Sequence, residues 1–150
     1  MLKLNGYGGP QAKANEKRQR FKGWETLVTL LMFRLEFKAK AITASRNKKD
    51  NYYMVGLADD KFDYKNYILF QRPITLGEDD DPESELNGIY AECNGDVTYN
   101  TCKSVSLTYE SVVFEVQDSI ITVDLSDVKL NKRFVEYSKE IFKELLTTKL

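Results

Sequence analysis

The residues with the clearest chemical potential are carboxylates, and many of them stand in one short stretch. Six of the eight residues from Glu78 to Glu85 are acidic, and so dense a run of like charge predicts an exposed loop. Two interpretations stay open. The run attracts a basic partner electrostatically, such as the nucleic-acid cleft of a nuclease, or it is a loop that is merely solvated. The acidic candidates for partner binding are Glu78, Asp79, Asp80, Asp81, Glu83 and Glu85.

The charge is unevenly placed along the chain. The formal net charge is −1, but residues 51–128 hold four Lys or Arg against sixteen Asp or Glu, and residues 1–50 hold twelve against four. A strongly negative central segment repels nucleic acid and attracts basic surfaces, although part of the acidity could simply keep a sheet soluble. The pattern favours a protein partner over a nucleic acid.

The same carboxylates can be tested against the spacing of a metal site. Asp81, Glu83, Glu85 and Glu92 stand at positions one, three, five and twelve of a calcium-loop pattern. Leu86 stands where the sharp turn of such a loop needs glycine. We therefore expect no metal and no cofactor.

A catalytic pair of carboxylates is the second chemical possibility. Glu92 together with Glu115 or Asp124, on adjacent strands, could reach the separation of about 5–9 Å that glycoside hydrolysis uses. Strand alternation, however, puts Glu115 and Asp124 opposite the apolar face, so that solvent exposure explains them equally well.

The sequence contains no histidine and two cysteines. Without histidine there is no Ser-His or Cys-His nucleophile pair, no His-ligated zinc and no usual general base near neutral pH. Cys93 and Cys102 form no CxxC pair, and we expect both to be reduced packing residues. These absences favour binding over catalysis, and the protein is predicted not to be an enzyme.

Glu92 lies within an otherwise apolar strand pattern, between Tyr90 and Asn94, and a period of two puts all three on one face. We consider it either a recognition carboxylate or an ordinary exposed residue of a sheet face. Tyrosine is a common interface anchor, and some of the nearby tyrosines could line a binding face while others belong to the core. The tyrosines in question are Tyr52, Tyr53, Tyr64, Tyr67, Tyr90 and Tyr99.

The elements that must position these residues are mostly strands. Period-two alternation or short apolar runs predict strands at 33–41, 52–57, 66–72, 89–93, 104–109, 112–117 and 120–125. We expect a polar turn over 45–50, a turn at 94–96 and a strand 66–72 covered on both faces near the sheet centre. Apolar residues at helical spacing then predict an amphipathic helix from about 132 to 146. The predicted fold class is α+β: an antiparallel β-meander sheet of about six to seven strands with the C-terminal helix packed on one face.

Residues 1–31 are predicted to be a flexible basic arm, and residues 32–150 the folded domain. Two interpretations of the arm stay open: translation naturally starts at Met32, or the arm touches a partner. Arg34, Glu36 and Lys38 interrupt the apolar stretch that a signal peptide would need, so we expect a cytoplasmic protein that does not bind membranes.

A set of ordered motifs resembles a known family. Tyr67–Arg72, an acidic spacer, Gly88–Asn94, and a strand pair through Leu107 and residues 113–116 are similar to the immunity protein 10 family of bacterial polymorphic toxin systems. The similarity runs from about Phe33 to Leu125. It implies an α+β fold and neutralisation of a co-encoded toxin.

Only some of the family's characteristic residues are present at the matching positions of this sequence. Family members often have a Gln shortly after the Asn of the second motif, where this chain has Gly95 and Asp96, so that contact is not carried over. The positions that match, as partner-binding residues or as residues that hold the fold, are Gln71, Arg72, Tyr90, Glu92 and Asn94.

The preferred prediction is a non-enzymatic immunity protein that occludes a cognate toxin, for which a nuclease is one candidate. Two alternatives stay open: a small-ligand module with an enclosed apolar pocket lined by Tyr and Phe, and an enzyme that uses converging carboxylates. Neither nucleic acid nor membrane is expected as a partner.

Overall fold

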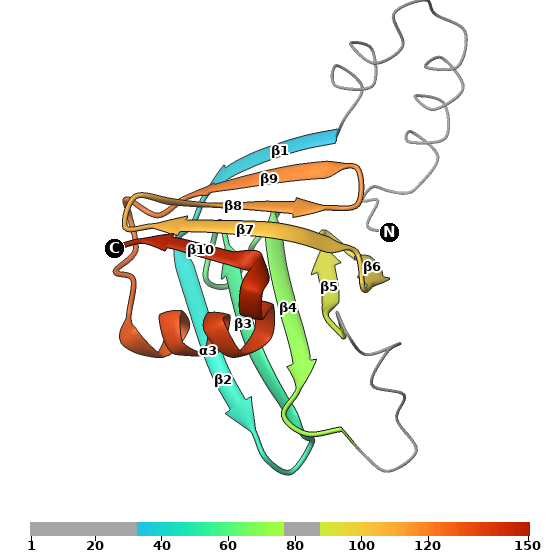
Figure 1. Cartoon of the computed structure of the whole chain (residues 1–150). Helices are drawn as coiled ribbons and strands as arrows, with labels where there is room; N and C mark the ends of the chain where they lie inside the picture. The colour runs from blue at the N-terminus through green and yellow to red at the C-terminus, as the bar shows by residue number, and fades with distance from the viewer. Residues whose placement is uncertain (1–32, 77–87) are drawn as a thin grey trace, which may run out of the picture.

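The computed structural model describes residues 33–76 and 88–150 (Figure 1). Its strands are β1 (Phe33–Lys38), β2 (Ala41–Asn47), β3 (Tyr52–Ala58), β4 (Tyr67–Pro73), β5 (Tyr90–Cys93), β6 (Asp96–Tyr99), β7 (Cys102–Thr108), β8 (Ser111–Val116), β9 (Ser119–Asp124) and β10 (Leu146–Lys149). The helices are α3 (Lys132–Phe142) and the short 3-10 helix η1 (Lys143–Leu145).

The strands form two five-stranded sheets that face each other (Figure 1). Sheet A has the order β1-β9-β8-β7-β10, and sheet B has the order β2-β3-β4-β5-β6. Sheet B is antiparallel throughout, whereas β1 pairs in parallel with β9, and β10 pairs in parallel with β7. The two outer strands of sheet A therefore come from the two ends of the described chain.

The core lies between the sheets and is built from the inward-facing half of each strand. Period-two alternation turns Ile68 and Phe70 of β4 inward, and β8 does the same with Phe114. The ring centroids of Phe70 and Phe114 are 4.8 Å apart, so this pair joins the two sheets. Phe142, the last residue of α3, packs against both rings at 5.0 and 6.1 Å.

Helix α3 lies on the inner face of sheet B, over β2 and β3 (Figure 1). It begins where the side chain of Asn131 accepts a hydrogen bond of 2.7 Å from the backbone N–H of Phe134, which satisfies one of the free N–H groups at a helix start. It ends at Phe142 because Lys143 has a φ of 53°, outside the helical region. Arg72 of β4 ties this end to the sheet, since its Nε donates to the carbonyl of Ile141 at 2.5 Å.

The predicted fold class is confirmed: the fold is α+β, with the C-terminal helix packed on the sheets. The arrangement of strands is richer than predicted, because the described residues form ten strands in two sheets. The expected strand 33–41 is divided at Ala39, whose N–H still bonds to Asp124 of sheet A, while the N–H of Lys40 bonds to Ala58 of sheet B. The alternation shifts by one residue at this point, because Phe37 and Ala39 face the core whereas in β2 the residues packed against it are Ile42 and Ala44, and Ala41 lies on the outer face.

Three further boundaries differ from the prediction. Strand β2 continues to Asn47, so the polar turn begins later than Ser45 and uses Asn51 at a φ of 61°. Residues 96–99 form β6, which the sequence pattern did not indicate. Helix α3 ends at Phe142 rather than at about 146, and residues 146–149 form β10, which pairs with β7 and which the sequence pattern did not indicate.

Strand β4 is central in sheet B, as predicted, but only one of its faces is covered. Ile68 and Phe70 are buried, whereas Tyr67, Leu69 and Gln71 on the other face are half-buried. No described helix or strand packs over this outer face. No helix in the described part of the chain is long and apolar enough to cross a membrane.

The joint between the sheets gives a stability prediction. Phe70→Ala should lower the free energy of unfolding by about 3–5 kcal/mol, because it removes a fully buried ring that contacts both Phe114 and Phe142. Phe62→Ala is the matched control, since that ring is 85% exposed and should change stability by less than about 0.5 kcal/mol. Urea denaturation measures the free energy of unfolding of both variants. Equal losses of stability would contradict the packing of Phe70 between the two sheets.

Candidate functional site: the outer face of sheet B

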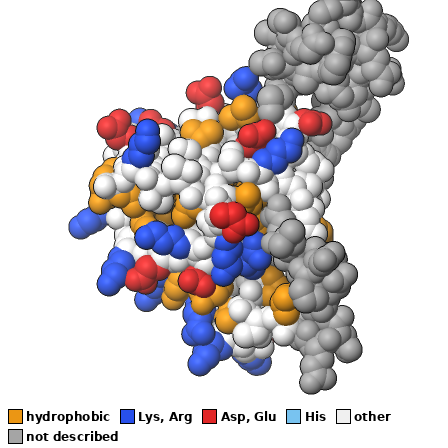
Figure 2. Space-filling view, in the orientation of Figure 1, with side chains coloured by type: hydrophobic (Ala, Val, Ile, Leu, Met, Phe, Trp, Pro, Cys, Tyr) orange, Lys and Arg blue, Asp and Glu red, His pale blue; other side chains and the backbone are white. Residues whose placement is uncertain are grey.

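The two sheets present different surfaces to solvent. The outer face of sheet A carries mostly charged and hydroxyl side chains, as a solvated sheet face does. These outward residues are Arg34, Glu36, Lys38, Ser104, Ser106, Thr108, Val113, Glu115, Ile120, Thr122, Asp124, Thr147 and Lys149. Charged side chains of both signs are also spread over the face that carries α3 (Figure 2).

The outer face of sheet B is instead rich in apolar and aromatic side chains. Its outward residues are Ala41, Thr43, Ser45, Asn47, Tyr52, Met54, Gly56, Ala58, Tyr67, Leu69, Gln71, Pro73, Tyr90, Glu92, Val97 and Tyr99. Among them Glu92 is the one charged residue, and the structure describes all five of these strands. Apolar faces of this kind on soluble proteins commonly mark interaction sites.

The strand register aligns this face into rows. Thr43, Gly56, Leu69, Glu92 and Val97 are successive cross-strand partners from β2 to β6. Residues in such a row lie one strand spacing apart, about 4.8 Å, and their side chains are direct neighbours. Glu92 therefore stands next to Leu69 and two strands from Gly56.

A second row runs parallel to the first on the same face. Ser45, Met54, Gln71, Tyr90 and Tyr99 are its successive partners from β2 to β6. The amide of Gln71 contacts the sulfur of Met54 at 3.5 Å, so this row is also closely packed.

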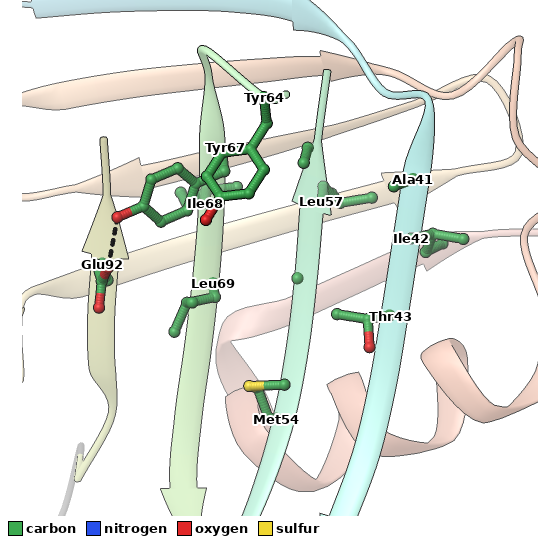
Figure 3. Close-up of a pocket in the computed structure, with 12 residues that line it drawn as sticks. Ala41, Ile42, Thr43, Met54, Leu57, Tyr64, Tyr67, Ile68, Leu69 and Glu92 are labelled. Atoms are coloured by element: carbon green, nitrogen blue, oxygen red, sulfur yellow. Dashed lines mark hydrogen bonds between the residues drawn. The ribbon is translucent and has the colours of Figure 1, made fainter. Parts of the chain in front are cut away.

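Gly56 leaves a hollow of about 260 Å³ in the middle of the face (Figure 3). A Cβ atom at Gly56 would lie 3.1 Å from Cγ2 of Thr43 and 3.4 Å from Cβ of Leu69, so even a methyl group there would crowd the floor of the hollow. The wall on the other side is formed by Tyr64 and Tyr67, with Glu92 at the end of the hollow (Figure 3). The hollow opens to solvent along the sheet surface, unlike the enclosed pocket that a small-ligand module would need.

Two tyrosine hydroxyls hold the carboxylate of Glu92. The hydroxyl of Tyr67 donates to Oε2, and the hydroxyl of Tyr90 donates to Oε1 at 2.5 Å. The described residues include no cation paired with Glu92, since their ion pairs all lie elsewhere. The carboxylate is thus fixed in place by hydroxyl groups, without an ion pair to a described Lys or Arg.

The tyrosines themselves are supported by further rings. Tyr64 meets Tyr67 edge to face at 5.1 Å, and Tyr99 meets Tyr90 in the same way at 5.3 Å. Such pairs contribute about 0.5–1.5 kcal/mol beyond the burial of area. Of the six tyrosines considered for a binding face, Tyr53 points the other way and packs against Tyr137 of α3 at 5.3 Å.

The pKa values of the two phenols that contact Glu92 are raised. Burial is the larger cause and the Glu92 carboxylate the second, and together they raise the pKa of Tyr67 to about 12 and also raise the pKa of Tyr90.

The turn after β5 positions Tyr67. Asn94 and Gly95 have φ angles of 51° and 91°, which is the backbone that an Asn-Gly hairpin turn requires. The side-chain oxygen of Asn94 accepts from the backbone N–H of Tyr67 at 2.8 Å, and the N–H of Gly95 donates to the Tyr67 hydroxyl at 2.9 Å. Asn94 therefore lies in the turn beside the face rather than on the strand with Tyr90 and Glu92.

The family-motif pair Gln71 and Arg72 is divided between the two faces of β4. Gln71 belongs to the outer face, while Arg72 points inward to the end of α3. The structure therefore joins Gln71, Tyr90 and Glu92 on one surface, with Asn94 at its edge, and gives Arg72 a place in the packing of the helix.

The predicted acidic set from Glu78 to Glu85 lies outside the described residues, as does the arm 1–31. The catalytic pairing of Glu92 with Glu115 or Asp124 is wrong, because these residues lie on the outer faces of different sheets. The core separates them, so they cannot converge on one substrate. In the described part of the chain no three potential ligands gather as a metal site would require.

Sequence reasoning missed the floor of the hollow, which is formed by Thr43, Met54, Gly56 and Leu69. One signal was present, since a glycine inside a strand pattern often marks a place where another group approaches closely. The half-exposed Leu69 could not be recognised from the sequence, because the run 66–72 is compatible with burial on both faces.

The candidate site is thus an open, aromatic sheet face with one fixed carboxylate, a composition that is common at protein interfaces. A family model described as Immunity protein 10 matches residues 38–132, well over half of the chain. The chain belongs to this family, as the resemblance of its motifs predicted. The match includes every strand of sheet B. A search of curated proteins found none that matches the chain.

The tyrosine pair gives a prediction for titration of the phenols. In Glu92→Gln the pKa values of Tyr67 and Tyr90 should fall, because the neighbouring negative charge is removed, yet they should stay above 10 because burial is the larger cause. Ultraviolet absorbance of the phenolates against pH measures this, with Glu115→Gln on sheet A as the control that leaves the curve unchanged. Identical curves for both variants would contradict the hydrogen-bonded triad of Tyr67, Tyr90 and Glu92.

Proposed function

We propose that this protein binds a cognate toxin through the outer face of sheet B and neutralises it by occlusion, without catalysis. The proposal rests mainly on one observation: the outer face of sheet B is apolar and tyrosine-rich, whereas that of sheet A is polar. Interface centres are enriched in aromatic residues and depleted of charge, and the outer face of sheet B has this composition. Membership of the Immunity protein 10 family supports a toxin as the partner.

The side chains available for chemistry support binding rather than catalysis. The chain has no histidine. Burial raises the pKa of the thiols of Cys93 and Cys102 to about 12, so neither is a thiolate at neutral pH. The remaining candidate for catalysis on the face is Glu92, whose two oxygens accept from tyrosines.

Long-range attraction of a basic toxin is a second part of the proposal. The acidic run from Glu78 to Glu85 follows β4 in the chain and precedes β5, two strands that form the proposed face. Acidic charge near an interface speeds encounter with a basic partner, such as a nuclease, and discourages nucleic acid. We place this interaction in the cytoplasm of the producing cell, with residues 32–150 as the folded unit.

The face can be tested by truncating one of its exposed rings. Tyr99→Ala should weaken binding of the toxin encoded beside this gene by about tenfold, because an aromatic anchor of an interface contributes roughly 1–2 kcal/mol or more. Tyr109→Ala is a closely matched control, since Tyr109 is 63% exposed against 65% for Tyr99 but follows β7 of sheet A. Calorimetry and survival of cells that co-express the toxin measure the effect.

The result that opposes the proposal is equally concrete. If wild-type protein leaves the neighbouring toxin fully active, neutralisation is wrong. If Tyr99→Ala and Tyr109→Ala weaken binding equally, the toxin is bound elsewhere than on the outer face of sheet B.

The acidic run gives a prediction about rates. Replacing Glu78, Asp79, Asp80 and Asp81 by their amides should lower the association rate several-fold at low salt and change the dissociation rate little, because such charges act mainly at a distance. Stopped-flow measurement at two salt concentrations tests this. An unchanged association rate would favour the simpler interpretation, a solvated loop.

A further inference from the structure

The hollow beside Glu92 has the chemistry of a receptor for one particular side chain. We propose that it takes an arginine of the partner, whose aliphatic stem lies over Leu69 and Gly56 and whose guanidinium reaches Glu92. This inference rests on the proposed function, and it names the chemical group that the outer face of sheet B recognises.

The first argument concerns the acceptor sites that remain on Glu92. A carboxylate offers about four lone-pair sites, two on each oxygen. Tyr67 uses one on Oε2 and Tyr90 uses one on Oε1, which leaves one on each oxygen. A guanidinium fork donates two parallel N–H groups, and a carboxylate with one free site per oxygen matches that geometry.

The second argument concerns charge. Glu92 is the one charge among the outward residues of β2 to β6, and the described residues supply it with no cationic partner. When a partner covers the face, this carboxylate loses its water, and a buried charge without a counterion costs several kcal/mol. Binding of an apolar partner group alone would therefore be opposed, whereas a guanidinium would compensate the charge.

The third argument concerns the shape of the hollow. Its lining is apolar along the row from Gly56 to Leu69, and Glu92 is its one charged residue, beside the hydroxyl groups of Thr43, Tyr64 and Tyr67 (Figure 3). Arginine has the same division, an aliphatic stem that can lie on apolar surface and a charged head. The rings of Tyr67 and Tyr90 flank the carboxylate and can add a cation–π contribution.

A second copy of this chain fits the hollow less well. A symmetric pairing through this face would put the same patch of both chains together and bring two Glu92 carboxylates into one interface. The outward residues of the five strands include no Lys or Arg that could compensate them.

The test uses N-acetyl-arginine amide as the probe and the full chain labelled with ¹⁵N. Titration should give saturable shifts of the backbone signals of Gly56, Leu69, Tyr90 and Glu92, with a millimolar dissociation constant. N-acetyl-citrulline amide keeps the shape but lacks the charge, and it should bind at least fivefold more weakly. Shifts of equal size with both probes, or shifts confined to other surfaces, would overturn the proposal.

Two variants separate the charge from the shape. Glu92→Gln should abolish the preference for arginine over citrulline, and Glu115→Gln on sheet A should leave it unchanged. Because Glu92→Gln could also loosen Tyr67 and Tyr90, Gly56→Ala serves as a second variant that fills the floor and keeps the triad. It should weaken the arginine probe several-fold while the phenolate titration stays as in the wild type, and undiminished binding to Gly56→Ala would contradict the hollow as the site.

The complex with the neighbouring toxin distinguishes this inference from the proposed function. Changing one particular arginine of the toxin to alanine should weaken the complex with the wild-type protein. The same change should have little further effect on the complex with the Glu92→Gln variant. If the toxin is bound and neutralised but no arginine shows this coupling, the arginine receptor is wrong and the proposed function stands. If the arginine probe binds as expected but the toxin does not, the proposed function is wrong and the guanidinium site stands. A dimer in sedimentation analysis that Glu92→Gln strengthens would show that the face belongs to a second copy and overturn the inference.

Discussion

The contact of Phe70 with Phe114 and Phe142 determines which surface this protein shows to others. Phe70 lies in the central strand of sheet B, and its ring joins the opposite sheet and the end of the helix in one cluster. Successive side chains in a strand alternate between faces, so an inward Phe70 forces Leu69 and Gln71 outward. The register then carries that choice across β3 and β5, which puts Gly56 and Glu92 beside Leu69 on the outer face. The packing of the core and the composition of the candidate site are therefore two results of one alternation.

The arrangement around Glu92 is well suited to recognition because it is rigid before any partner arrives. Both oxygens are held by hydroxyls, and both tyrosines are held in turn by a second ring. A side chain that is already ordered loses less conformational entropy on binding, so more of its interaction energy contributes to affinity. A carboxylate held by a flexible loop would bind a partner more weakly through the same contacts.

The local features of the site could be predicted from the sequence, whereas its composition across strands could not. Tyr90 and Glu92 are two residues apart in one strand, and a period of two is enough to put them on the same face. Tyr67 reaches the same carboxylate from 25 residues away, and only the pairing of β4 with β5 brings it there. Asn94 was expected on that face, but the turn that it forms with Gly95 removes it from the strand.

By itself, the sequence determined the inward and outward positions within most strands, the amphipathic helix and the lack of histidine chemistry, because these depend on residue type and short-range periodicity. Only the tertiary structure decided that the chain passes from sheet A to sheet B at Ala39, that β1 and β10 add parallel edges, and that one face of β4 stays open. The physical reason is that alternation is the same whichever strand lies alongside. Which strands pair is decided by how the side chains of distant segments fill one core, and a local pattern carries no information about that.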